Sequence, residues 1–399
     1  MQQHKPIDWA SPAVQLALLD AKQTFRAVGR DSRIVRASFR YNVQKKQFLS
    51  VCKQLLYRFT KRQKATSALR VFFWLPGGLG DAACARRLVS AYRALLPGAQ
   101  FEIFFTVAQA AQTVFAGMEN VSFATDVKRY WKDYDLVVQA CLAAKFLYVN
   151  TARLQTLAPD FMPVLRQAQA AQANLGELLE DPFVTEPVLG RMMRAIGARR
   201  FDLLAYTSGV PLEHDAKERL TFNKNTLEKF NLVGKEYITF HDGSLGEEDT
   251  ATRMWPNPYW RKLLQQIKRQ FPQITLVQLG KPGNYFYDEA DVCLVGQTQL
   301  TELPSILFGA RLHLDSESGL VHLAQYTFVP SVVLFGPSEK DFFAYSRNTN
   351  LSAGNCGGCM WAKPDWMTSC PLDHKAALCM HEITAESVWE AVRARLTAH

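Results

Sequence analysis

The stretch Asp315-Ser-Glu-Ser-Gly-Leu-Val-His-Leu-Ala324, with Pro330-Ser-Val-Val-Leu-Phe-Gly-Pro337 after it, decides the fold that this sequence predicts. The apolar run 310–314 that leads into it is typical of a buried strand. A small polar turn then opens a helix, with Ser316 or Ser318 as its N-cap. The next strand ends in a Gly-Pro loop that can close over the same place. This order of strand, turn, helix and strand is the repeating unit of a doubly wound sheet, which binds ligands beyond the carboxyl ends of its strands.

From Glu317 onward the sequence reads acidic-Ser-Gly-Leu-x-His-Leu-Ala, followed by a strand that ends in Phe-Gly-Pro. This pattern resembles the nucleotide-sugar site of the bacterial heptosyltransferases, glycosyltransferase family 9. The resemblance covers roughly residues 69 to 395 and is stronger in the C-terminal half. It implies a GT-B fold, in which two Rossmann-like domains face each other across a cleft. It also implies an inverting transfer of heptose from ADP-heptose.

The alternation of strands and helices begins at Leu69 and predicts parallel sheets in an α/β protein. Residues 150–220 are mostly helical by pattern, and 221–235 is the expected passage between two sheets. We expect four parts: a helical, basic N-terminal extension (1–68), a Rossmann-like acceptor domain (69–225), a Rossmann-like nucleotide-sugar domain (226–355), and a cysteine finger with a C-terminal helix (356–399).

Charge is unevenly spread along the 399 residues: residues 21–70 hold fourteen Lys or Arg and one acid, Asp31. The basic amphipathic segment 46–64 fits contact with anionic lipid, or a helix packed on the catalytic domain with a solvated basic face. No nucleic-acid-binding motif is present. No apolar run approaches the ~20 residues of a membrane helix, and the N-terminus lacks a signal-peptide core. We expect a cytoplasmic protein, peripheral to the inner membrane if the lipid interpretation holds.

A glycine-rich turn, Pro76-Gly-Gly-Leu-Gly-Asp81, stands where the first strand ends and the first helix begins. Gly78 and Gly80 allow a tight turn and close approach of a ligand, although the pattern is not that of a phosphate loop. Asp81 either caps the helix or, as the resemblance implies, is the general base. A carboxylate there can accept the proton of an acceptor hydroxyl.

The second sheet is expected to begin with a strand at 236–240, and His241 follows this strand, with Ser244 in the loop and Arg253 nine residues after Ser244. In the resembled family a Lys in Lys-x-Trp-Pro meets the donor phosphates, and this chain has Arg253 at that Lys position. The planar guanidinium is a competent phosphate clamp. The loop 245–250 is longer than in the family. His241 is either a buried core histidine or a ligand contact.

Glu317 stands where the resembled family usually has an Asp that touches the donor sugar. Asp315, two residues earlier, lies on the same side of an extended segment and is an alternative sugar contact. Four further residues match the family's phosphate-binding turn: Ser318, Gly319, Leu320 and His322.

Four of the eight cysteines lie within 24 residues: Cys356, Cys359, Cys370 and Cys379. This spacing predicts a structural zinc or a rubredoxin-like iron, with two disulfides as the alternative. The heptosyltransferases that modify autotransporter proteins, a subgroup of the resembled family, carry such a cysteine-bound iron. No catalytic metal is expected, because Arg253 and a helix N-terminus can support the leaving group.

The sequence thus predicts a glycosyltransferase that acts on a hydroxyl of a cell-surface glycan, lipid-linked or protein acceptor. Two alternatives stay open: a UDP- or GDP-hexose donor on the same fold, and a non-catalytic nucleotide-binding scaffold of GT-B type. Whether the chain forms a homo-oligomer also stays open.

Overall fold

The computed structural model describes residues 6–31, 67–125, 131–179, 182–243, 252–363 and 365–398. The loop residue Ser244 and residues 32–66, which include the basic amphipathic segment 46–64, lie outside this part. The chain forms two compact units. The first takes in described residues of Met1–Gly77, Ala85–Ala111 and Met118–Leu212, and the second those of Gly78–Cys84, Gln112–Gly117 and Glu213–His399.

The first unit is built on a five-stranded sheet in the order β3-β2-β1-β4-β5. Its strands are β1 (Arg70–Leu75), β2 (Gln100–Phe105), β3 (Val121–Phe123), β4 (Leu136–Ala140) and β5 (Ala144–Val149). The first four pair in parallel, as the alternation predicts, whereas β5 runs antiparallel to β4. The apolar run of β1 is almost wholly buried, as expected for the central strand of a sheet covered on both faces.

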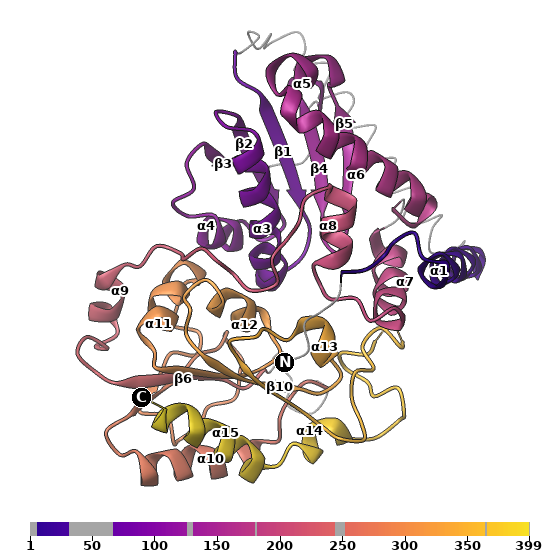
Figure 1. Cartoon of the computed structure of the whole chain (residues 1–399). Coiled ribbons are helices and arrows are strands. Elements are labelled where there is room, and N and C mark those ends of the chain that lie inside the picture. Colours follow the sequence, from indigo (N-terminus) through magenta and orange to yellow (C-terminus); the bar gives the residue numbers. More distant parts are fainter. Residues whose placement is uncertain are drawn as a thin grey trace. The chain divides into compact units, whose positions relative to one another are not determined.

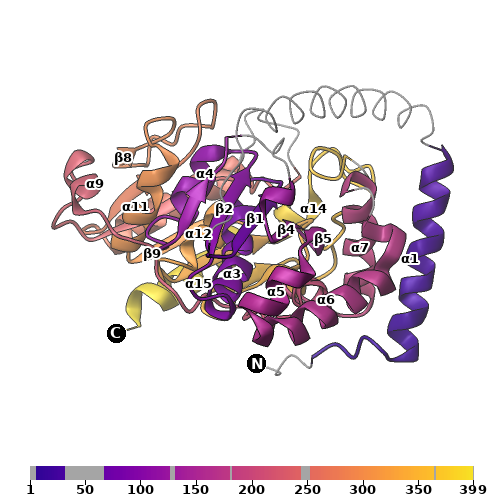
Figure 2. The same cartoon turned by 90° about the horizontal axis from the view of Figure 1, so that it is seen from above.

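Six helices of the described part accompany this sheet: α3 (Leu79–Leu95), α4 (Ala108–Val114), α5 (Thr151–Leu157), α6 (Met162–Leu175), α7 (Pro182–Ala195) and α8 (Asp202–Ser208). The first helix of the chain, α1 (Pro12–Asp31), lies along α7 (Figure 2). Val14, Leu18 and Phe25 recur on one side of α1 and are buried. The Arg26 guanidinium donates to Glu177 over 2.6 Å. The described part of the N-terminal extension is therefore a docked amphipathic helix.

The second unit is a six-stranded, all-parallel sheet in the order β11-β10-β9-β6-β7-β8. Its strands are β6 (Tyr237–His241), β7 (Thr275–Gln278), β8 (Val292–Cys293), β9 (Leu312–Ser316), β10 (Ser331–Phe335) and β11 (Thr349–Ser352). The strand order reverses between β6 and β9. In doubly wound sheets such a switch point is where ligands bind.

Helices cover both faces of this sheet, with α11 (Leu303–Gly309) and α12 (Gly319–Ala324) on one and α10 (Asn257–Gln270) and α15 (Ala385–Thr397) on the other (Figure 1). The remaining helices are α9 (Lys224–Lys229), α13 (Lys340–Phe343) and α14 (Leu378–Glu382). Helix α10 buries residues at helical spacing, from Trp260 through Leu263 and Leu264 to Ile267. Within the described residues, no helix has the length and apolar character needed to cross a lipid bilayer.

The fold is thus α/β with two Rossmann-like units, as the sequence predicts. Strands β5, β8 and β11 are additions that the pattern did not predict.

Candidate active site

Polar side chains gather at the carboxyl ends of β6 and β9, the switch point of the second unit. The strands pair so that His241, the last residue of β6, lies opposite Asp315 on β9. The turn after β9 opens α12, and the Ser318 hydroxyl accepts from the backbone N–H of Leu320 over 3.1 Å. Ser318, not Ser316, is therefore the N-cap.

Asp315 is fully buried and accepts hydrogen bonds from three side chains. His241 Nδ1 lies 2.9 Å from Oδ1, while His313 Nε2 and Ser318 Oγ lie 3.2 Å and 2.5 Å from Oδ2. Burial opposes ionisation, but the neighbouring histidines, His241 first, outweigh it and lower the pKa of Asp315. Burial likewise opposes the charging of His241, yet the Asp315 carboxylate raises the pKa of His241 above its ordinary value. The geometry therefore favours a charged pair.

Glu317 is a second buried carboxylate with its own histidine. His322 Nε2 lies 3.2 Å from Glu317 Oε1, and Ser338 Oγ donates to Oε2 over 2.7 Å. Arg253 Nη1 approaches the same Oε2 at 3.5 Å. Burial acts against the charge, but His322 and then Arg253 bring the pKa of Glu317 down to about 2. The carboxylate is therefore ionised near neutral pH.

His322 is enclosed on both sides. Its Nδ1 lies 2.6 Å from the Tyr345 hydroxyl and 3.9 Å from Cys84 Sγ. Burial works against its charge, but Tyr345, Cys84 and Glu317 raise the pKa of His322 well above its ordinary value.

Arg253 reaches the site from the irregular segment before α10. The residue before it, Thr252, is tied to the cysteine-rich segment: its N–H donates to Met367 O over 3.0 Å and its hydroxyl to Trp366 O over 2.7 Å. The Arg253 guanidinium also lies 5.8 Å from the centre of the Trp366 ring. Residues 366–367 thus form a wall of the candidate site.

Two buried polar atoms at this place, Arg253 Nε and Ser316 Oγ, have no hydrogen-bond partner among the described residues. Buried polar groups are normally paired, so unpaired ones point to a bound ligand or water. The carboxyl ends of β6 and β9 therefore have the character of a ligand site for an anion or a polyhydroxyl group.

The glycine-rich turn places Asp81 in the first turn of α3. Its Oδ2 accepts from the backbone N–H of Gly78 over 2.9 Å, so Asp81 reaches back to the helix start as the acidic half of a capping box does. Segment Gly78–Cys84 belongs to the second unit. A Cβ on Gly80 would lie 2.8 Å from His322 Cδ2, and one on Gly319 would lie 3.1 Å from Gly80 N. Both positions need glycine because backbone and ring approach so closely.

The structure brings together Arg253, Glu317 and His322, and His241 is linked to the same turn through Asp315 and Ser318. Leu320 is buried, and it serves the cap through its backbone. The sequence interpretation missed several contributors: Thr239, His313, Ser338, Tyr345 and Trp366. His313 lies two residues before Asp315 on one strand, a spacing that could have signalled a shared side.

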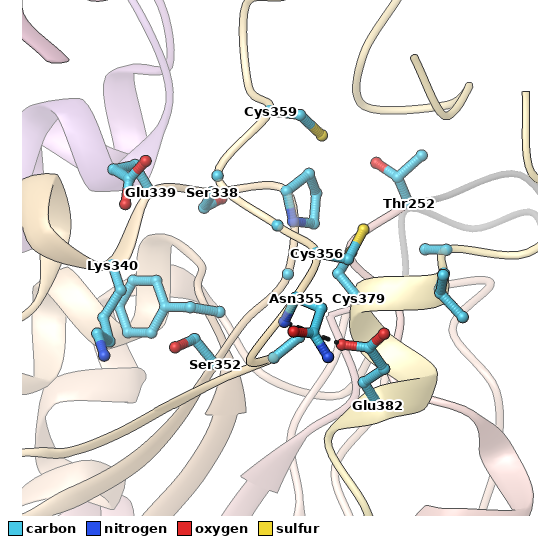
Figure 3. Close-up of a pocket in the computed structure, with 18 of the residues that line it drawn as sticks. Thr252, Ser338, Glu339, Lys340, Ser352, Asn355, Cys356, Cys359, Cys379 and Glu382 are labelled. Carbon is cyan, nitrogen blue, oxygen red and sulfur yellow. Dashed lines mark hydrogen bonds between the residues drawn. The ribbon is translucent and has the colours of Figure 1, made fainter. Parts of the chain in front are cut away.

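The four predicted metal ligands line one pocket of about 570 Å³, together with the loop that follows β10. Figure 3 shows Cys356, Cys359 and Cys379 around this pocket. Gly357 and Gly358 have φ values of 129° and 61°, a region that favours glycine. The Gly358 N–H donates to Gly336 O over 2.9 Å, which fastens the Cys-Gly-Gly-Cys turn to the loop after β10.

All four are free thiols, and Cys379 is buried. Burial, with the neighbouring sulfurs of Cys356 and Cys359, raises the pKa of the Cys379 thiol to about 12. A soft cation would relieve this, because thiolates that repel one another are stabilised by a shared metal. Among the described residues, however, no three Cys, His, Asp or Glu side chains stand close enough to hold an ion as they are placed.

Comparisons with known proteins find similarity to heptosyltransferases, both in a family model and in curated proteins. The model of glycosyltransferase family 9 (heptosyltransferase) matches residues 194–376. Lipopolysaccharide heptosyltransferase 1 of Pseudomonas aeruginosa is 27% identical over 121 residues, which are 29% of this chain and 33% of that protein. Lipopolysaccharide heptosyltransferase 2 of Salmonella typhimurium is 28% identical over 107 residues, or 24% and 31% of the two chains.

Solved structures agree on the fold. The iron-containing dodecameric glycosyltransferase TibC of enterotoxigenic E. coli superposes with a TM-score of 0.55 at 15% identity, covering 84% of this chain and 80% of that one. TibC has also been solved with ADP-D-β-D-heptose. The family 9 glycosyltransferase of Veillonella parvula gives a TM-score of 0.50 at 13% identity, covering 82% and 97%.

The matches to the curated relatives span about a third of their length. The family model, the curated relatives and the solved structures of similar fold are thus all described as glycosyltransferases or heptosyltransferases.

Proposed function

We propose that this chain is an inverting family 9 glycosyltransferase that transfers heptose from ADP-heptose to an acceptor hydroxyl. One observation carries the proposal: the switch point of the second unit brings together Arg253, His241, Ser318 and a buried Ser316 Oγ that has no hydrogen-bond partner in the described part of the chain. A nucleotide diphosphate sugar offers the two kinds of group that these side chains suit, phosphate anions and hydroxyls. The ADP-heptose complex of TibC, a similar fold, favours this donor.

Each side chain has a proposed role. Arg253 binds the pyrophosphate through its guanidinium, and the Ser318-Gly319 turn lies against the phosphates, with Gly319 leaving room for them. Glu317, locked by His322 and Ser338, presents a fixed carboxylate to sugar hydroxyls. Asp81 is the general base.

The reaction balances in one displacement. The acceptor oxygen attacks the anomeric carbon on the face opposite the leaving group, and the bond from that carbon to the phosphate oxygen breaks. ADP leaves with the electron pair, and the hydroxyl proton passes to Asp81. A lipid-linked glycan, another cell-surface glycan and a protein hydroxyl all fit as acceptors. A UDP- or GDP-hexose donor and a non-catalytic scaffold remain the alternatives that the experiment separates.

The four cysteines are proposed to hold one structural zinc or iron. The soft, all-sulfur set fits either ion, and the similar fold of TibC is described as iron-containing. A bound ion would cross-link the four cysteines and stabilise the finger, and it would take no part in the reaction of the substrate. Through residues 366–367 the finger supports Thr252 and Arg253, so it is tied to donor binding.

Further assignments follow the same proposal. The acceptor is assigned to the first Rossmann-like part (69–225) and the donor to the second (226–355). TibC is described as dodecameric, which makes a homo-oligomer worth testing. Contact of the basic N-terminal extension with anionic membranes also stays a proposal.

A panel of nucleotide sugars tests the function. ADP-heptose should raise the melting temperature, since a ligand that binds only the folded state stabilises it. UDP- and GDP-hexoses should raise it less. Release of ADP in the presence of a lipopolysaccharide-core acceptor or an autotransporter passenger then identifies the acceptor class. A larger shift with another nucleotide sugar would replace the donor, and binding without transfer to any acceptor would favour the scaffold.

A further inference from the structure

The two ring nitrogens of His241 have different surroundings. Nδ1 is committed to Asp315 Oδ1 at 2.9 Å. Nε2, on the other side of the ring, has no hydrogen-bond partner among the described residues. The His241 side chain is 14% exposed, whereas Asp315 is 0% exposed. His241 is therefore fixed at its inner nitrogen and available at its outer one.

A chain of buried side chains fixes Asp315 in turn. Its Oδ2 accepts from His313 Nε2 at 3.2 Å, so that nitrogen carries a proton. On the other side of the His313 ring, Nδ1 lies 2.9 Å from the Thr239 hydroxyl. Both oxygens of Asp315 are thus occupied by donors of the protein. Because the Asp315 side chain is also 0% exposed, it has little capacity to contact a sugar, the role that sequence reasoning considered for it, whereas the Glu317 side chain keeps 8% exposure.

We propose that Asp315 is a positioning residue that keeps His241 as an imidazolium and directs its Nε2–H toward the pyrophosphate of the donor. The inference rests on the proposed function and deepens it. Asp315 itself touches no substrate, while His241 touches the leaving group.

The chemistry needs such a donor. As the bond to the anomeric carbon breaks, negative charge grows on the departing phosphate oxygen, and a fixed N–H aimed there stabilises that charge. The proton stays on His241, because the acceptor's proton goes to Asp81. In many proteins a carboxylate binds one ring nitrogen of a histidine and thereby fixes the direction of the other nitrogen.

The charges around His241 determine its pH dependence. Asp315 and Asp242 favour the imidazolium, while burial and Arg253 disfavour it, and the balance raises the pKa of His241. Donor binding should therefore be strong at low pH and weaken as pH rises through this raised pKa. Replacing the carboxylate by an amide removes the main support, so the weakening should move to lower pH by about 1–3 units.

The experiment measures ADP-heptose binding by calorimetry between mildly acidic and mildly alkaline pH. The esterified pyrophosphate of this probe does not itself titrate in that range. Four proteins are compared: the unmodified chain, Asp315→Asn, His241→Gln and the control Asp291→Asn. Asp291 lies just before β8, outside the site, and accepts from the backbone N–H of Leu276 over 2.8 Å. Deprotonation of His241 is expected to weaken binding by about tenfold to a hundredfold.

The affinity of the unmodified chain and of the control for ADP-heptose should fall as pH rises. For Asp315→Asn the same fall in affinity should occur at lower pH. For His241→Gln the affinity should not change with pH. If Asp315→Asn keeps the unmodified profile, or His241→Gln keeps the pH dependence, the inference is overturned. No ADP-heptose binding by the unmodified chain at any pH would instead reject the proposed donor.

A second readout covers the case in which Asp315→Asn folds poorly. Histidine ring signals in NMR report the pKa of His241 directly in the unmodified chain and in the milder Ser318→Ala, which removes one donor to Asp315 but leaves the ion pair. The inference expects a His241 pKa above its ordinary value in both. An ordinary or lowered value in the unmodified chain would contradict it.

Discussion

Asp315 and Glu317, two residues apart, are both buried, both backed by a histidine and both face a cation, yet they are held differently. Asp315 is saturated by three side-chain donors and its cation, His241, sits at 2.9 Å. Glu317 is fixed by His322 and Ser338, but its cation, Arg253, stays 3.5 Å away. The His241–Asp315 pair is held tightly, whereas the Arg253 guanidinium is only loosely attached to Glu317. From this difference we propose that Arg253 exchanges Glu317 for an arriving anion, whereas His241 keeps its place beside Asp315.

Asp81 is the contrast to both carboxylates, and its replacement should have the largest effect. Its Oδ2 accepts a hydrogen bond from the backbone N–H of Gly78, and its proposed role is to take a proton, not to hold a cation. Asp81→Asn should lower turnover by roughly 10²–10⁴-fold with donor affinity nearly unchanged. Steady-state kinetics with donor-binding calorimetry measures both. Near-normal turnover would leave Asp81 as a helix-terminal residue alone.

Replacement of Arg253, the cation of the loosely attached Arg253–Glu317 pair, should lower the affinity for the donor. Arg253→Ala removes a charge-assisted contact, so ADP-heptose should bind about 1.5–3 kcal/mol more weakly. Arg253→Lys keeps the charge without the planar fork and should lose less. Calorimetry on both variants checks the order. Equal loss in the two would show that the fork geometry, not charge, dominates.

The cysteine finger contacts Thr252, next to Arg253, so a change in the finger should alter the Arg253–Glu317 pair but not the His241–Asp315 pair. Cys370→Ser is expected to lower the metal content from about one ion per chain and to weaken ADP-heptose binding several-fold through residues 366–367. Cys293→Ser, at β8, is the matched control. Elemental analysis and calorimetry are the measurements. Full metal content with Cys370→Ser, or absence of metal from the unmodified chain, would reject the metal proposal.

The smallest effect is expected for Glu317→Gln, in how the free energy of unfolding depends on pH under acidic conditions. The pKa of Glu317 is lowered to about 2, so its ionisation stabilises the fold above the unfolded value of ~4.3. That stabilisation is lost as pH falls from about 5 toward 2. Glu317→Gln should therefore lose stability near neutrality and show a shallower acid dependence. Urea unfolding at several pH values measures this, and an unchanged slope would show that His322 does not hold an ionised carboxylate.

The sequence predicted what depends on local signals. Alternation of apolar strands and helices located β1, β6 and β10. The polar turn before α12 predicted a serine cap, Ser316 or Ser318, and the structure shows that it is Ser318. The pattern could not predict β11, because its sequence Thr-Asn-Leu-Ser carries no strand signal. It missed β5, a short antiparallel edge strand beside β4.

The electrostatic arrangement of the site depends on contacts between distant residues, so it could not be predicted in the same way. His241 and Asp315 are 74 positions apart and meet only through the register of β6 with β9. Thr252 and Trp366 are 114 positions apart. Residue types therefore indicated a phosphate site, while the division into a tight and a loose carboxylate–cation pair needed the structure.

Hydrogen–deuterium exchange with and without ADP-heptose tests the central claim most directly, because it locates the donor without any mutation. The account predicts slower exchange in two segments of the second unit, Tyr237–His241 with the Arg253 region, and Leu312–Ala324. Protection confined to the first unit's sheet, or ADP-heptose binding with no change in these segments, would contradict it.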